Sequence, residues 1–125
     1  VNCDKEACYT WSLVDGGESR ACRGVNATDD ADSYYDVVEG IKTLDDCVGL
    51  CNAQNAACAT STCKQACSGV EYHPTFNEGR CEVWKRPADL DKVAGIYYPG
   101  IGASTVKEGF TCLRFEAVGE PAQRC

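Results

Sequence analysis

The chain of 125 residues contains one histidine, no methionine and no apolar run near the roughly 18 residues that a membrane-spanning helix needs. Basic side chains are also scarce, twelve against nineteen acidic ones, for a formal net charge of −7. The short apolar runs predict a protein that does not insert into a membrane. The shortage of Lys and Arg argues against nucleic acid and heparin-like polyanions as partners, because both bind clustered basic residues.

Groups that support catalysis are scarce as well. A Cys–His nucleophile pair needs a thiolate beside an oriented base, and the one histidine, His73, precedes Pro74 at the end of a predicted strand. No glycine-rich loop opens a helix after a predicted strand, as a phosphate cradle requires. Glu71 and Glu82 fall on neighbouring predicted strands, but acids on strand surfaces are much commoner than catalytic carboxylate pairs. We expect no enzyme activity and no cofactor.

Cysteine, by contrast, is abundant: eleven residues, about 9% of the chain, the density of a disulfide scaffold. Thiols at this density persist as disulfides in oxidising surroundings, so the sequence predicts a secreted or luminal protein. Structural zinc is the alternative, but the spacing of Cys47/Cys51 and of Cys63/Cys67 suits a helical turn as well as a zinc knuckle, and we expect no metal. Because eleven is odd, one thiol is free or bonded to another chain.

The first third of the sequence carries two further signals. The chain begins at Val1 without a recognisable targeting segment, so we expect a processed product. Asn26-Ala27-Thr28 is an N-glycosylation acceptor sequence, with Asn26 as the modified residue. The acidic residues at 29–32 are interpreted as a solvated loop. A calcium loop is the alternative, although the run lacks the Asp-x-Asp-x-Asp-Gly spacing and a downstream bidentate glutamate.

Residues 43–52 have the pattern of an amphipathic helix. Thr43 is a favourable N-cap, and Asp46 three residues later completes a pair that resembles a capping box. The apolar positions recur at i, i+3, i+4 and i+7 and form one stripe: Leu44, Cys47, Val48 and Cys51. Two cysteines one turn apart on this stripe predict a helix that is stapled to the structure beneath it.

Strands are predicted where β-branched and aromatic residues lie between turn residues, at 34–38, 69–73, 80–84, 96–98 and 110–115. Pro74 and Gly79 bound the connection between the second and third of these, which predicts a hairpin. Strands gathered around one helix, without crossover helices, predict an α+β fold with an antiparallel sheet. Weak periodicity over residues 1–20 suggests an extension outside the domain.

The motifs between residues 21 and 116 follow one another in this order: Ala21-Cys22-Arg23-Gly24, Tyr35-Asp36-Val37-Val38, Thr43-Leu44-Asp45-Asp46-Cys47 with Cys51, Cys67-Ser68-Gly69-Val70-Glu71-Tyr72, Gly79-Arg80-Cys81-Glu82-Val83-Trp84, and Thr111-Cys112-Leu113-Arg114-Phe115-Glu116. In this order they resemble a PAN/apple module. The resemblance implies a curved antiparallel sheet of about five strands packed on one helix and stapled by disulfides. It divides the chain into an N-terminal extension (1–20), the domain (21–116) and a C-terminal tail (117–125).

The resemblance also implies disulfide pairings: Cys47–Cys81 and Cys51–Cys67 between helix and hairpin, and Cys22–Cys112 between the two ends of the domain. Residues 56–66 are longer than the family's usual connection and add Cys58 and Cys63, whose proximity suggests a local Cys58–Cys63 bridge. Cys51–Cys58 is a rival to Cys51–Cys67. One more bridge is expected among Cys3, Cys8 and Cys125.

PAN/apple modules bind proteins and carbohydrates, so the resemblance implies a non-enzymatic extracellular binding module for a protein or glycan ligand. The candidate contact residues are Tyr72, His73, Trp84, Lys85, Tyr97 and Tyr98. For the aromatic residues, packing in the core or across strands is the alternative. A second functional hypothesis is a structural or accessory subunit of a larger extracellular or luminal assembly, which the odd cysteine would join through an intermolecular disulfide.

Overall fold

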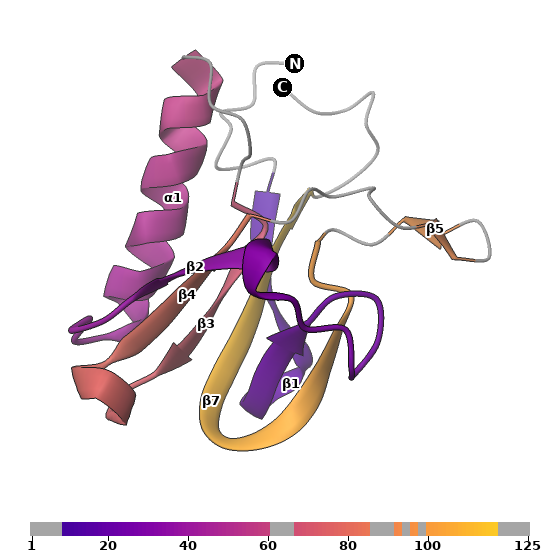
Figure 1. The fold of residues 1–125 in the computed structure, drawn as a ribbon. Coiled ribbons are helices and arrows are strands. Elements are labelled where there is room, and N and C mark those ends of the chain that lie inside the picture. Colours follow the sequence, from indigo (N-terminus) through magenta and orange to yellow (C-terminus); the bar gives the residue numbers. More distant parts are fainter. Residues whose placement is uncertain (1–8, 61–66, 86–91, 94–95, 98–99, 118–125) are drawn as a thin grey trace.

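The computed structural model describes residues 9–60, 67–85, 92–93, 96–97 and 100–117 (Figure 1). Along the chain, its strands, helix and 3₁₀ turns are β1 (Tyr9–Arg23), η2 (Asp32–Tyr34), β2 (Tyr35–Val38), α1 (Leu44–Thr60), β3 (Gly69–His73), η3 (Phe76–Glu78), β4 (Arg80–Trp84), β5 (Lys92–Val93), β6 (Ile96–Tyr97) and β7 (Ala103–Ala117). Within these residues, no helix combines the length and the apolar character needed to span a membrane.

Five of the strands form one sheet in the order β1-β7-β3-β4-β2, with every neighbouring pair antiparallel. The predicted strand at 96–98 is different: its described part, β6, pairs with β5 in a separate two-stranded sheet. Helix α1 lies along one face of the large sheet, over β3 and β4 (Figure 1). One helix packed on a five-stranded antiparallel sheet with disulfide staples confirms the predicted α+β fold class.

The helix begins as its sequence predicts and ends later. The backbone N–H of Asp46 donates to Thr43 Oγ1 at 3.0 Å, so Thr43 is the N-cap. Beyond residue 52 the helix continues to Thr60, through alanine-rich sequence with high helix propensity. Near its end, the Asn55 side chain accepts from the Cys67 N–H at 2.7 Å and donates to the Cys67 carbonyl at 3.1 Å. The helix is therefore tied to the start of β3.

Three predicted disulfides are present: Cys22–Cys112, Cys47–Cys81 and Cys51–Cys67. The rival pairing of Cys51 with Cys58 is wrong, because Cys51 is bonded to Cys67. The other predicted bridges involve cysteines outside the described residues: Cys63, Cys3, Cys8 and Cys125. Three disulfides in so small a fold indicate that the protein matures in an oxidising compartment.

Each face of the sheet has its own core, because successive side chains on a strand point to opposite faces. The first core lies under α1 and consists of Cys47, Cys51, Cys67, Val70, Tyr72, Cys81 and Val83. The second lies on the opposite face and consists of Val14, Cys22, Trp84, Ile101 and Cys112. The long, bent ribbon of β1 and β7 contributes to this second core (Figure 1).

Strand β1 corrects the expected domain boundary. Residues 9–20 belong to the sheet rather than to an extension, since β1 pairs with β7 from Tyr9 through to Arg23. The pairing register shifts between Leu13 and Arg20, and in this interval Asp15 and Ser19 have positive φ. Such a bulge breaks the alternation of side chains that identifies a strand in a sequence. The interruption explains why residues 1–20 have weak periodicity.

Candidate functional site

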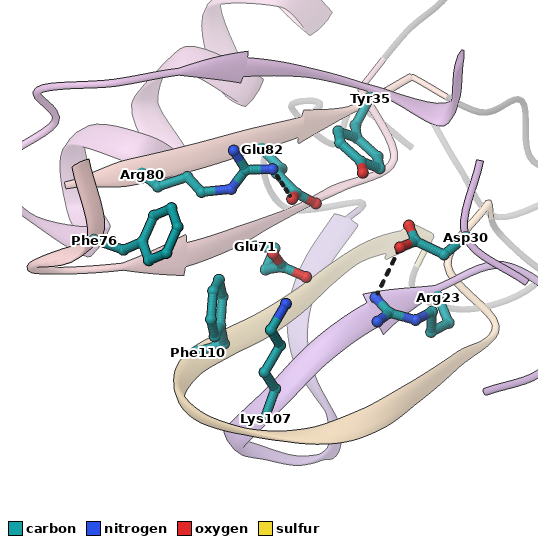
Figure 2. A pocket seen from close by; sticks show the side chains of 9 residues that line it. All are labelled: Arg23, Asp30, Tyr35, Glu71, Phe76, Arg80, Glu82, Lys107 and Phe110. Carbon is teal, nitrogen blue, oxygen red and sulfur yellow. Dashed lines mark hydrogen bonds and ion pairs between the residues drawn. The ribbon is translucent and has the colours of Figure 1, made fainter. Parts of the chain in front are cut away.

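A pocket of about 270 Å³ opens on the sheet face that α1 does not cover (Figure 2). Ligand pockets in proteins typically enclose about 300–1,000 Å³, so this one is sized for a small ligand. Its lining comes from strands β1, β2, β3, β4 and β7, from η3 and from the loop before η2: Arg23, Asp30, Tyr35, Glu71, Phe76, Arg80, Glu82, Lys107 and Phe110. Side chains from both halves of the chain therefore meet here.

Two acidic residues lie at the centre of this pocket. Glu71 and Glu82 are directly opposite each other on β3 and β4, and only 3% and 5% of their surfaces are exposed. As cross-strand partners in a buried setting, the two carboxyls do not both ionise readily, because like charges at close quarters favour retention of a proton. Burial and the negative charge of Glu82 raise the pKa of Glu71 to about 9. At neutral pH, Glu71 is therefore protonated and serves as a hydrogen-bond donor.

Neighbouring groups hold both carboxyls in place. The backbone N–H of Cys22 donates to Glu71 Oε1 at 2.7 Å. An Arg80 guanidinium N–H donates to Glu82 Oε2 at 2.7 Å, and Trp84 Nε1 donates to Glu82 Oε1 at 3.2 Å. Because the Cys22–Cys112 disulfide fixes the first donor and β4 fixes the other two, the acid pair is rigidly oriented.

Two further cations lie around the acid pair. Arg23 donates to the Cys22 carbonyl at 2.7 Å and forms an ion pair with Asp30 at 3.6 Å. Lys107 places its Nζ 4.8 Å from the centre of the Phe110 ring and points toward Glu71 in Figure 2. The pocket therefore presents positive and negative groups side by side.

Aromatic rings form the remaining wall. Phe76 and Phe110 both line the pocket, with ring centres 6.4 Å apart; Phe110 is buried, whereas 50% of Phe76 is exposed. Burial, with the nearby charges of Glu82 and Asp30, raises the pKa of Tyr35 to about 12. The Tyr35 phenol therefore stays protonated and keeps its hydrogen for donation.

Two of the predicted contact residues are buried instead. Trp84 has no exposed surface and Tyr72 has 4%, so the alternative interpretation as core residues is correct for both. Tyr72 lies on the α1 side of the sheet, where its hydroxyl donates to the Ile41 carbonyl at 2.6 Å. Trp84 does not line the pocket and acts on it only through its hydrogen bond to Glu82.

His73 and Lys85 were also predicted as contact residues, and neither lines the pocket. His73 ends β3 and packs against Phe110, with ring centres 4.7 Å apart. Lys85 forms an ion pair with Asp36 at 2.9 Å. Tyr97 belongs to the β5–β6 pair, and Tyr98 lies outside the described residues.

The loop between β1 and η2 contains the predicted glycosylation site and the acidic run. Asn26 is exposed, and its Oδ1 accepts from the Thr28 N–H at 3.0 Å and from its hydroxyl at 2.8 Å. Asp29 is not simply solvated, because its carboxylate binds the Val25 N–H at 2.8 Å and the Tyr34 hydroxyl at 2.7 Å. In the part of the chain that the structure describes, no cluster of three metal-ligating side chains occurs.

Most of the pocket was not predicted from the sequence. The sequence pattern places Glu71 and Glu82 on neighbouring strands, but it does not indicate which basic and aromatic residues surround them. One usable signal was the alternation along β4, which puts Arg80, Glu82 and Trp84 on one face. Tryptophan is largely buried in most proteins, so a tryptophan on the same strand face as two charged residues indicates that this face is covered rather than solvated.

Comparison of the chain with protein-family models, with curated proteins and with solved structures finds no match.

Proposed function

We propose that this chain is a non-enzymatic PAN/apple-type binding module of a secreted or luminal protein, and that its charged pocket binds a carbohydrate. The family assignment is supported by one helix on a five-stranded antiparallel sheet and by three disulfides at the positions that the sequence resemblance implies. The ligand assignment is supported by one observation: hydrogen-bonding carboxyls and exposed phenyl surface share a single small pocket.

This combination suits a sugar. Each hydroxyl of a sugar both donates and accepts hydrogen bonds, and the pocket offers an acceptor in Glu82 beside donors in protonated Glu71 and in Tyr35. A pyranose ring also has an apolar C–H face, for which the half-exposed ring of Phe76 at the pocket wall is a matching surface.

The spacing of the acids supports binding without cleavage. Glycoside hydrolases hold their two carboxyls about 5–5.5 Å apart in retaining enzymes and about 6.5–9.5 Å apart in inverting ones. Glu71 and Glu82 are instead direct cross-strand partners on adjacent strands, with only 3% and 5% of their surfaces exposed, and so do not flank an open cleft. Glu82 is also held by Arg80 and Trp84 and is not available as a nucleophile.

The size of the pocket favours a sugar over a protein as its occupant. A stable protein interface buries about 800 Å² on each partner. A single concavity of about 270 Å³ cannot offer a contact surface of that extent. Among the described residues, the large exposed apolar side chains outside the pocket are single residues on different strands, namely Leu13 on β1, Val37 on β2 and Val106 on β7. The assembly-subunit hypothesis is favoured by a different observation, the odd number of cysteines.

A glycan array probed with disulfide-intact protein tests the proposal, with calorimetry on the strongest hit. We expect Phe76→Ala and Lys107→Ala to weaken binding about tenfold, the effect of losing one stacking or charged contact of about 1.4 kcal/mol. Val106→Ala is the matched control, since Val106 lies on the same β7 strand as Lys107 and 72% of it is exposed away from the pocket lining. A blank array, or binding that both variants leave intact, overturns the carbohydrate site.

Mass measurement under reducing and non-reducing conditions tests the second hypothesis. A covalently attached partner that is released by reductant supports the assembly subunit. A monomer whose mass is unchanged by reductant, apart from the protons added to its disulfides, contradicts it.

A further inference from the structure

His73 holds the turn that carries Phe76. Its Nδ1 accepts two backbone hydrogen bonds, from the Thr75 N–H at 3.2 Å and from the Phe76 N–H at 3.0 Å. An imidazole nitrogen that accepts has no proton of its own, so the neutral ring carries its hydrogen on Nε2. Both amides therefore depend on the unprotonated form of one side chain.

The turn that these bonds hold has an uncommon backbone. Asn77 and Glu78 have φ of 50° and 63°, and Gly79 follows with φ of 109°. Two successive residues other than glycine in the left-handed region persist only when their surroundings impose this conformation. The turn's own bonds are few: the Glu78 N–H to the Thr75 carbonyl at 3.2 Å and the Gly79 N–H to the Phe76 carbonyl at 3.0 Å.

The same imidazole also contacts the pocket wall. Its ring packs edge-on against Phe110, with centres 4.7 Å apart, and against Phe76, with centres 6.0 Å apart. A Cβ on Gly109 would collide with the imidazole, so the β7 backbone lies directly against the ring. His73 thus contacts both phenylalanines that line the pocket: Phe110 through the imidazole ring, and Phe76 through the ring and the hydrogen bond from its backbone N–H.

We infer that His73 is a pH-dependent latch of the pocket: the neutral imidazole fixes the turn at residues 75–79, and the imidazolium releases it and displaces Phe76. Once Nδ1 is protonated it donates, and the Thr75 and Phe76 amides then face a hydrogen instead of a lone pair. This pH-dependent change concerns the turn only and does not require a ligand. Its consequence, weaker binding of a carbohydrate in mildly acidic surroundings, rests on the proposed function.

The charges around the ring are mixed. Arg80 is the cross-strand partner of His73, and Lys107 lies over the Phe110 ring against which the imidazole packs. Glu78 in the turn and Glu108 beside Gly109 are exposed carboxylates. Glu71, on the same strand, stays protonated because its pKa is raised to about 9. Ordinary carboxyls titrate near pH ~4 and histidines near ~6.5, so a change between pH 7.5 and 5.5 mainly reports histidine, of which the chain has one.

Amide hydrogen exchange measured by NMR tests the latch without any ligand. Between pH 7.5 and 5.5, we expect the protection factors of Thr75 and Phe76, corrected for the intrinsic exchange rate, to fall about tenfold or more. Amides of the β3–β4 ladder are the internal control and keep their protection. Unchanged protection at Thr75 and Phe76 overturns the latch.

Two variants sharpen this test. In His73→Asn, the amide oxygen can accept in place of Nδ1 and does not titrate, so protection persists at both pH values. In His73→Ala the acceptor is absent, and protection is low at both. A pH effect that survives in His73→Asn also overturns the latch. If the array yields a sugar, its affinity should fall at pH 5.5 in wild type only; if it yields none, the proposed function fails while the exchange data still decide the latch.

Discussion

Glu71 on β3 lies directly opposite Glu82 on β4, and both side chains are buried. The pair retains one proton at neutral pH, and Arg80 balances the remaining negative charge at 2.7 Å. A sheet face normally buries apolar side chains at such positions. Here two ionisable groups occupy these positions, and their burial determines their protonation. The stability of the fold is therefore sensitive to pH.

The first prediction concerns Glu71→Gln. The pKa of Glu71 is about 9 in the folded chain against an ordinary value of 4.5, so the folded state retains a proton that the unfolded state releases. The contribution of Glu71 to stability is therefore complete below about pH 4.5 and is lost as pH rises toward 9. Glutamine stays neutral, so the variant should be more stable than wild type at pH 8, by roughly 1–3 kcal/mol, and less sensitive to pH.

Urea denaturation at pH 5 and at pH 8 measures this effect. Glu108→Gln, an exposed carboxyl on β7, is the control and should parallel wild type at both pH values. Equal pH dependence in wild type and Glu71→Gln would contradict the raised pKa of Glu71.

The second prediction separates the buried ion pair from a surface one. Arg80→Met leaves the Glu82 carboxylate buried with its cation removed, and should destabilise the fold by roughly 2–4 kcal/mol. Adding Glu82→Gln to that variant should restore part of the loss, because no buried charge then remains. Lys85→Met breaks the more exposed Lys85–Asp36 pair and should change stability by about 0–1 kcal/mol.

A thermodynamic cycle over Arg80 and Glu82 checks this prediction through the interaction free energy. A coupling no larger than that of Lys85 with Asp36 would show that the Arg80–Glu82 pair behaves as an ordinary surface contact.

The third prediction ranks two disulfides. Cys22–Cys112 spans a sequence separation of 90 and Cys51–Cys67 one of 16. In the chain-entropy description, a loop of about 100 residues contributes about 4.7 kcal/mol and one of about 15 residues about 3 kcal/mol. Replacing both cysteines of the first pair by alanine should therefore lower the free energy of unfolding more. Because Cys22 also donates to Glu71, exchange of the pocket amides should increase only in that variant.

The features that could be predicted from the sequence are those encoded by neighbouring residues. Thr43 caps α1, and the buried Cys47 and Cys51 recur at helical spacing, so the staples on the hairpin followed from a local pattern and a family resemblance. Strand β1 could not be recognised, because a bulge between Leu13 and Arg20 breaks its alternation. Its partner in β7 lies far along the chain, and single-sequence periodicity carries no information about such pairing.

The pocket could not be predicted from the sequence for the same reason: its residues meet through non-local pairing. Glu71 alternates with Val70 and Tyr72, which predicts that it faces away from the helix, and in most half-buried sheets that face is solvated. It is buried here because the β1–β7 ribbon bends over it and brings Cys22 within 2.7 Å. Where Lys107 and Phe110 lie depends on that non-local bend rather than on the residues beside them.

The final prediction compares two glycines for which alanine should have opposite effects. Gly79 has φ of 109°, and a Cβ there would collide with the Ile41 carbonyl. The two residues are already in close contact, because the Ile41 N–H donates to the Gly79 carbonyl at 3.0 Å. Gly79→Ala should therefore destabilise the fold by roughly 2–4 kcal/mol, through both steric overlap and an unfavourable backbone conformation. Gly49 lies in α1, is exposed, and has no atom within 4 Å of where a Cβ would stand. Gly49→Ala should stabilise the fold by about 0.5–1 kcal/mol, since alanine loses less backbone entropy in a helix. Thermal unfolding of the two variants and wild type measures both signs; a destabilising Gly49→Ala would contradict the packing of α1, and a neutral Gly79→Ala would contradict the close approach of the hairpin turn to Ile41.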